Sequence, residues 1–535
     1  MSESLSSRTK TSTETRDTES TIEPLLADRW TNNITYRQLV MSSCIGIVQL
    51  WWHPYVHDFR RHLPFMFMYN VLSVLLVYPA FYLELALGVV TKKGVLNCWD
   101  MAPVARGIGL SMILSCAFMA LSFGAVSAWS LSMVVHSFHS FLPWLHCAAA
   151  ANPPCSARHR PLTNGSETPS QSFFFNFVLN LKRDGFNGGL GNVVPDLTVY
   201  YVISWVLVYF IACKRIYSYS KMVLFKDVLS FFVLVSSVIG VIRLRGASRM
   251  FTECDWSVLF EGVHIWREAL EYALIQMSAS QGTLIMLGSY CPKQKRVLSS
   301  TCLSAFVACK LSSIAAALVL GATHGALYYD YDNSTNIWKG SSSAMILWAD
   351  YAARIPGSQV WSALIFSTLF VLSVCSTALL VQTIMSTFTG RSIRKISWAI
   401  LVLMCVIFGI VGIITLCTQG GMYILNFLMT WPVLQTRNPI AGAVPIVVTY
   451  VYGQTTFCED VYFAVGEYPC VFLRICWALT PAIFLLIFVT GITTWSETDV
   501  AGWILTMLVL LPIAIFALFY LVFKFRVRNI VAHEK

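Results

Sequence analysis

The chain has 535 residues, of which 56% are hydrophobic and only 12% are charged. A water-soluble protein carries about twice that share of charged residues, so the composition excludes a soluble enzyme. The net charge of +10 does not indicate a nucleic-acid partner, because the basic residues lie in short segments between apolar runs.

Apolar runs near 20 residues long recur along the chain, and each can cross about 30 Å of hydrocarbon as a helix. The runs lack the alternation that strands of a membrane barrel require. We therefore expect an all-α polytopic membrane protein with twelve transmembrane helices, near residues 34–57, 63–90, 108–140, 197–213, 222–243, 264–290, 299–322, 360–388, 396–417, 422–452, 470–492 and 499–523.

The segments outside these spans indicate one large domain with two tails. Residues 1–29 are rich in Ser, Thr and Glu, and are expected to form a disordered cytoplasmic tail without a cleavable signal peptide. Residues 30–525 form the twelve-helix domain, with large loops at 141–196 and 323–359, and residues 526–535 form a second cytoplasmic tail.

Basic residues concentrate in short connections that all fall on one side of this twelve-span arrangement. Such connections stay in the cytoplasm, so both termini are expected inside, with the plasma membrane as the expected location. The two large loops then face outward, where disulfides and glycans form. They contain Cys147 and Cys155 and the glycosylation sequons at Asn164 and Asn333.

An ordered series of motifs follows the expected spans. It includes the run from Pro79 to Gly88, Gly107-Ile108-Gly109, Leu142-Pro143-Trp144, Thr418-Gln419-Gly420-Gly421 and Thr480-Pro481. The series resembles the sodium- and chloride-dependent neurotransmitter transporter family (the neurotransmitter:sodium symporters) over residues 30–525. The resemblance implies the inverted-repeat fold of the leucine-transporter class, in which spans 1–5 and 6–10 are the repeats and two helices follow. Substrate and ions would bind near mid-membrane, where spans one and six are broken. A disulfide between Cys147 and Cys155 is expected in the outer loop.

The resemblance also places candidate substrate residues. Gly46 stands where amino-acid carriers have glycine, either to leave room for a carboxylate or to allow helix packing. Phe123 replaces a tyrosine whose hydroxyl meets substrate, and Ser278 lies in the expected break of span six with Gln276 before it. Arg437, in span ten, is a further candidate, because a cation at membrane depth usually marks a pathway or a partner. The alternative for Arg437 is a water-filled loop beyond a shorter span.

The ion-binding positions of the family are degraded in this sequence. Gln49 replaces an asparagine sodium ligand, and Ser376 is retained from the second sodium site. Tyr69 is retained from the family's chloride-binding residues, which are called the chloride set below. The other positions of this set are Tyr272, Gln276, Ala305 and Cys309. Sodium dependence is therefore expected to be weak or to rest on the second site alone, and chloride dependence to be absent.

Two further substitutions and one retained residue concern the gates and span six. The charged pair of the outer gate reads Trp52 and Met429, so an apolar contact is expected to replace a salt bridge. Glu84 is expected to bond backbone amides of broken span six, with proton transfer as the alternative.

These observations predict a secondary transporter of small organic solutes, with amino acids or their derivatives as the best class and with altered ion coupling. The alternative is a non-transporting relative that binds a regulatory partner, because ion, substrate and gate positions have changed together. No enzyme activity, catalytic residue, metal site or cofactor is expected, and Na⁺ at the remnant of the second site is the one ion expected to remain. The expected partners are a small-molecule substrate and the lipid bilayer, and the sequence leaves the oligomeric state open.

Overall fold

The structure is a computed structural model that describes residues 33–53, 58–147, 153–158, 162, 166–185, 189–292, 295–331, 340–388, 397–493 and 500–533. These residues form helices and connecting loops, and their only β-pairing is two isolated bridges. The all-α prediction is confirmed for this part of the chain.

Twelve helical regions correspond to the twelve expected spans. They are α2 (Asn33–Cys44) with α3 (Val48–Trp51); α4 (Phe59–Leu72) with η1 (Ser73–Val77) and α5 (Tyr78–Thr91); α6 (Arg106–Ser137); α8 (Pro195–Ala212); α9 (Arg215–Val241); α11 (Val263–Gln276) with α12 (Thr283–Ser289); α13 (Val297–Asp330); α15 (Ser358–Met385); α16 (Ser397–Thr415); α17 (Gly421–Leu428) with η9 (Met429–Gln435), α18 (Arg437–Ile446), η10 (Val447–Gly453) and α19 (Gln454–Val465); α20 (Val471–Thr493); and α21 (Val500–His533).

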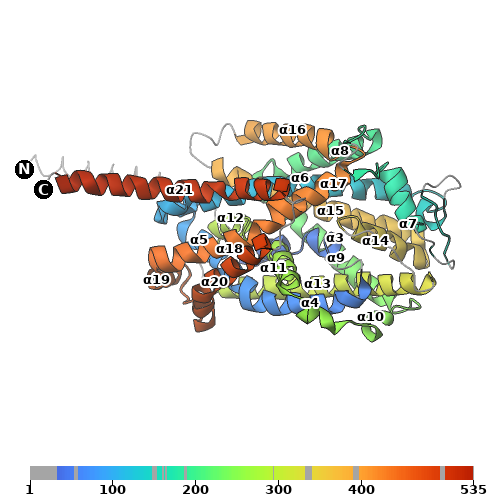
Figure 1. Cartoon of the computed structure of the whole chain (residues 1–535), viewed down its shortest axis with the longest axis horizontal. Helices are drawn as coiled ribbons and strands as arrows, with labels where there is room; N and C mark the ends of the chain where they lie inside the picture. The colour runs from blue at the N-terminus through green and yellow to red at the C-terminus, as the bar shows by residue number, and fades with distance from the viewer. Residues whose placement is uncertain are drawn as a thin grey trace, which may run out of the picture.

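Ten of these regions are individually long and apolar enough to cross a membrane within the described residues. The other two are the pairs α2–α3 and α11–α12, which coincide with expected spans 34–57 and 264–290 and are each interrupted. Short helices α7 (Pro169–Ser172) and α14 (Ser343–Arg354) lie towards one end of the bundle, and α5 and α19 lie towards the other (Figure 1). The predicted polytopic helical fold is confirmed.

The two interruptions have different local causes. Between α2 and α3, residues 45–47 leave the helix around Gly46, which has no β-carbon. Between α11 and α12, three residues take left-handed backbone angles, with φ of 54° at Ser278, 61° at Ser280 and 81° at Gly282. Left-handed conformations are unfavourable for serine, so surrounding contacts must hold this second break open.

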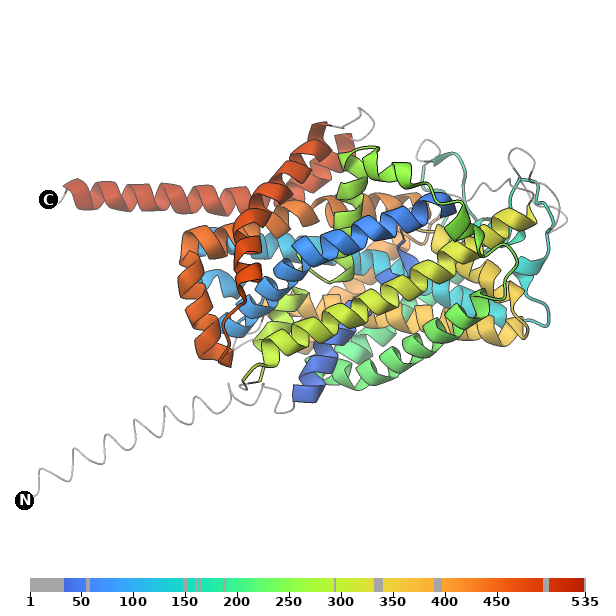
Figure 2. The same cartoon turned by 90° about the horizontal axis from the view of Figure 1, so that it is seen from below.

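The last helix is longer than the sequence pattern predicts. α21 contains 34 residues and ends at His533, whereas the last span is expected to end at residue 523. At 1.5 Å per residue it is about 51 Å long, well above the roughly 30 Å of a bilayer core. Its C-terminal part projects beyond the bundle (Figure 2).

The outer loop contains the expected cross-link. Cys147 and Cys155 form a disulfide with their Cα atoms 5.6 Å apart, so that prediction is confirmed. The sequons at Asn164 and Asn333 lie outside the described residues.

Candidate functional site

A cavity lies where the two helix interruptions meet. The space between its lining atoms, counted together with the part open to solvent, is about 360 Å³, and the centre of a water molecule can occupy about 20 Å³ of it. Its wall comes from the α2–α3 and α11–α12 breaks and from α6, α9 and α15. The predicted site residues that line it are Gly46, Gln49, Phe123, Gln276, Ser278 and Ser376; the other lining residues are Ser42, Ser43, Val48, Met119, Tyr219, Ile275, Gln281, Leu379 and Leu380.

The two interruptions contact each other directly. The Ser278 hydroxyl donates to the backbone carbonyl of Ser43 at 2.8 Å. The Cys44 thiol points at the carbonyl of Met277 with a sulfur–oxygen distance of 3.9 Å. Ser278 therefore bonds to exposed backbone of the other break, a way of satisfying carbonyls that have left a helix.

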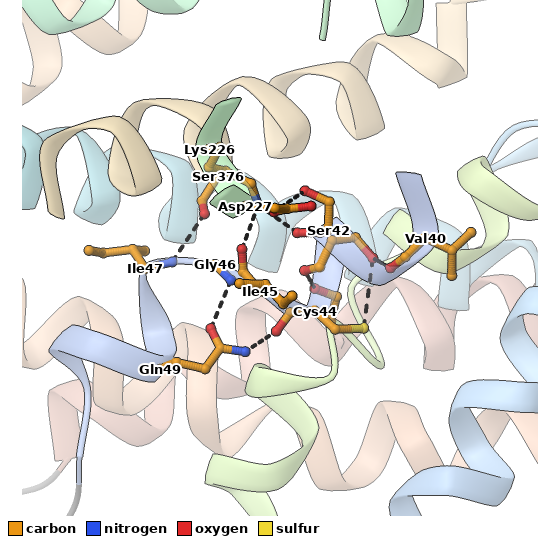
Figure 3. A network of polar contacts seen from close by, with 12 residues as sticks. Val40, Ser42, Cys44, Ile45, Gly46, Ile47, Gln49, Lys226, Asp227 and Ser376 are labelled. Carbon is orange, nitrogen blue, oxygen red and sulfur yellow. Dashed lines mark hydrogen bonds and ion pairs between the residues drawn. The ribbon is translucent and has the colours of Figure 1, made fainter. Parts of the chain in front are cut away.

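Gln49 closes the first interruption with its own side chain. Its Oε1 accepts from the backbone N–H of Gly46 at 2.8 Å, and its Nε2 donates to the carbonyl of Cys44. The amide oxygen that would serve an ion is thus occupied by a backbone donor (Figure 3). Gly46 is also confined, because a β-carbon there would lie 3.0 Å from the Ser376 hydroxyl oxygen.

The tyrosine of the expected chloride set belongs to a second polar cluster. Tyr69 donates its hydroxyl proton to Gln276 Oε1, and Gln276 Nε2 donates to Ser313 Oγ at 3.1 Å. Lys310 of α13 contacts the Tyr69 hydroxyl and donates to Ser73 Oγ at 2.7 Å. Gln276 joins this cluster to the cavity, because it belongs to both.

Two ionisable side chains bond to the backbone of the second interruption. The backbone N–H of Ser280 donates to Glu84 Oε1 at 2.7 Å, which confirms the expected role of Glu84. Arg437 donates to the carbonyl of the preceding residue, Ala279, at 3.4 Å, and to Met119 Sδ at 3.2 Å. Two buried ionisable side chains therefore bind the two ends of one peptide group of this break, the one that joins Ala279 to Ser280.

The solvated-loop alternative for Arg437 is wrong. The residue begins α18, between the π-helical segments η9 and η10, and its side chain is completely buried. Arg437 reaches the cavity through Met119, which lines it. A direct role for Arg437 on the permeation route stays a prediction.

The outer-gate positions lie in an aromatic region. Trp52 packs on Trp51 with ring centroids 5.4 Å apart, and Trp51 meets the edge of Phe123 at 6.2 Å. Met429 is fully buried at the start of η9. A contact between Trp52 and Met429 remains a prediction, whereas Trp51 is an aromatic neighbour of the cavity that sequence reasoning missed.

Two lysines were also missed, Lys226 of α9 and Lys310 of α13. Both lie inside expected membrane spans, where charged side chains are rare and usually functional. That signal alone could have identified them.

Comparisons with known proteins agree with this architecture. Residues 27–528 match the model of the Sodium:neurotransmitter symporter family. The chain is 25% identical over 523 residues to the mouse Sodium- and chloride-dependent neutral and basic amino acid transporter B(0+), covering 88% of this chain and 80% of the relative. It is 24% identical over 517 residues to the Sodium-dependent nutrient amino acid transporter 1 of Drosophila grimshawi, covering 89% and 80%. The chain therefore belongs to the sodium:neurotransmitter symporter family.

Proposed function

We propose that this protein is a secondary active transporter of amino acids or closely related small solutes, with ion coupling that differs from the pattern of its family. The observation that carries the proposal is the cavity shared by the two helix interruptions. The relatives reported above are amino acid transporters by name, which supports the same substrate class for this chain.

The composition of the cavity suits a small zwitterion. Its polar side carries serine hydroxyls and amides beside backbone that has left the helices, and such groups can bond a carboxylate and an ammonium. Its other side is apolar, with Met119, Phe123, Leu379 and Leu380, where a substrate side chain can pack. Gly46, Phe123, Gln276 and Ser278 are the proposed substrate contacts.

The proposed change in coupling rests on how the ion positions are filled. The Gln49 amide oxygen bonds to Gly46, and Tyr69 bonds to Gln276 and Lys310. Side chains of the protein thus occupy groups that ions would otherwise engage. We place the protein in the plasma membrane with both termini in the cytoplasm, in line with the basic short connections.

The test is counterflow in proteoliposomes containing the purified chain, with a panel of labelled amino acids, in sodium and in choline. We expect saturable counterflow of at least one amino acid. Gly46→Val should abolish it, because the added carbons meet Ser376. The matched control is Gly409→Val in α16, where an added β-carbon meets nothing within 4 Å, and this variant should transport normally.

Two outcomes of the counterflow test would contradict the proposal. If folded wild-type protein gives no counterflow with any amino acid, or if Gly46→Val transports as well as Gly409→Val, the cavity is not an amino-acid transport site. The first of these outcomes would favour the non-transporting alternative.

A further inference from the structure

Lys226 is a buried lysine of α9 whose ammonium lies against the interruption between α2 and α3 (Figure 3). The side chain is only 1% exposed. Its Nζ donates to the backbone carbonyl of Ser42 at 2.7 Å and to that of Ile45 at 2.5 Å. A cation in this position is costly in a membrane unless oxygen atoms surround it.

The two carbonyls are available because the helix is interrupted. In a continuous helix the carbonyl of Ser42 would accept from the N–H of Gly46, four residues later. Here the N–H of Gly46 donates to the Gln49 side chain, the carbonyl of Ser42 accepts a 3.3 Å bond from the N–H of Ile45 instead, and α3 begins only at Val48. The break thus turns carbonyl oxygens towards α9, and a cluster of such oxygens is what a hard cation prefers.

One further oxygen lies beside the ammonium, and another lies beside the interruption. Asp227 Oδ1 lies 3.4 Å from Lys226 Nζ and also accepts from the Ser42 hydroxyl at 2.9 Å. The Ser376 hydroxyl, on the opposing helix α15, accepts from the N–H of Ile47 at 3.3 Å. Lys226 therefore has three oxygen partners for its three N–H donors.

A simple ion pair between neighbours on α9 does not account for this geometry. The shortest contacts of Lys226 are to the two carbonyls, and the carboxylate of Asp227 is farther away. The ammonium therefore binds mainly to the backbone of the break. Asp227 balances its charge and accepts a hydrogen bond from the Ser42 hydroxyl. This part of the site is also where a remnant of the second sodium site is expected from the sequence. It contains the carbonyls of Ser42 and Ile45 and the hydroxyl of Ser376.

We propose that the Lys226 ammonium is a tethered cation that takes the place of a sodium ion at the α2–α3 interruption. A mobile cation cannot occupy the same oxygens, because the ammonium already fills them and repels a second positive charge. The protein thus holds this break in shape without sodium. The inference goes beyond the proposed function, since it specifies how ion coupling is altered.

The first experiment measures thermal unfolding of the purified full chain in sodium, potassium and choline chloride at equal concentration. Wild-type protein should melt at the same temperature in all three salts. Lys226→Ala should melt lower in choline and recover several degrees in sodium, because the vacated oxygens can bind the ion. Lys221→Ala is the control, since Lys221 is an exposed lysine on the same helix, and it should behave as wild type.

The second experiment measures counterflow of the amino acid identified for the proposed function, and this arm alone depends on that function. Wild-type rates should be equal in sodium and choline. Lys226→Ala should lose about tenfold or more of the counterflow rate in choline, because the carbonyls of Ser42 and Ile45 lose the ammonium as a donor, and it should regain activity in sodium.

Two results would overturn the inference. A sodium-specific rise in melting temperature of the wild type would show that sodium binds with Lys226 in place, and this needs no variant to fold. A folded Lys226→Ala protein that responds to sodium no more than Lys221→Ala would show that the ammonium replaces no ion. Because melting requires no substrate, a protein that fails to transport amino acids would leave this test intact.

Discussion

Glu84 provides the most direct test of how the second interruption is held open. Its carboxylate accepts the backbone N–H of Ser280, a serine in the left-handed conformation, and both residues are buried. Replacing Glu84 by Ala removes the acceptor and leaves a buried N–H unsatisfied, which costs about 1–3 kcal/mol. The guanidinium of Arg437 also loses a favourable electrostatic interaction with Glu84.

Glu84→Gln separates these contributions. The amide keeps an oxygen that can accept from Ser280, so we expect a loss of only about 1–2 kcal/mol. Unfolding can be followed with a thiol-reactive dye, because buried cysteines such as Cys116 become accessible on melting. Glu459→Ala, which changes an exposed glutamate of α19, is the control.

The expected order of melting temperature is wild type and Glu459→Ala together, then Glu84→Gln, then Glu84→Ala. The reasoning would be refuted if Glu84→Ala melted with the wild type. It would also be refuted if Gln were as damaging as Ala, since the hydrogen bond to Ser280 would then not be what stabilises the break.

The remaining predictions concern four other parts of the chain. Arg437→Gln should weaken substrate affinity more than Arg437→Lys at equal surface expression, and unchanged affinity in both would remove Arg437 from the route. Non-reducing peptide mapping should find Cys147 and Cys155 linked, and recovery of both as alkylated thiols would contradict the structure. Counterflow should be unaffected when chloride is replaced by gluconate, because side chains fill the Tyr69 cluster; a steep chloride requirement would contradict this. Hydrogen bonds from Lys93 and Arg106 lower the pKa of Asp100, so the stability that this carboxylate contributes is present above the unfolded pKa of about 3.9 and is lost as pH falls through the lower folded pKa. At neutral pH Asp100→Asn should reduce the free energy of unfolding by at most about 1 kcal/mol, because the site is exposed. A reduction that grew on acidification would contradict this prediction.

The architecture could be predicted because its signals are local in the sequence. Apolar runs of membrane length and basic short connections need no knowledge of tertiary contacts. The disulfide and the bond from Glu84 to the second break followed from ordered motifs. The position of the break near Gly46 followed from the resemblance to the transporter family.

The chemistry of the site was less predictable because its partners are backbone groups. Lys226 is 184 residues from Ser42 in sequence, and no side-chain pattern indicates that a helix break will present carbonyls to it. Gln49 looked like a lengthened ion ligand, but its extra methylene lets the amide fold back onto Gly46. Arg437 was ambiguous because Pro439 and Pro445 permit a loop or a helix, and only π-helical turns resolve the choice.

Tethering a positive charge at the α2–α3 interruption has a consequence for energetics across a polarised membrane. A sodium ion that travels with substrate gains about 2.3 kcal/mol for each 100 mV it crosses, and this drives accumulation. An ammonium attached to α9 cannot leave with the substrate, so the membrane potential does no work through it. At this position the carrier would therefore respond to the substrate gradient alone, and currents recorded during uptake of a zwitterion should lack the charge that a bound ion would contribute.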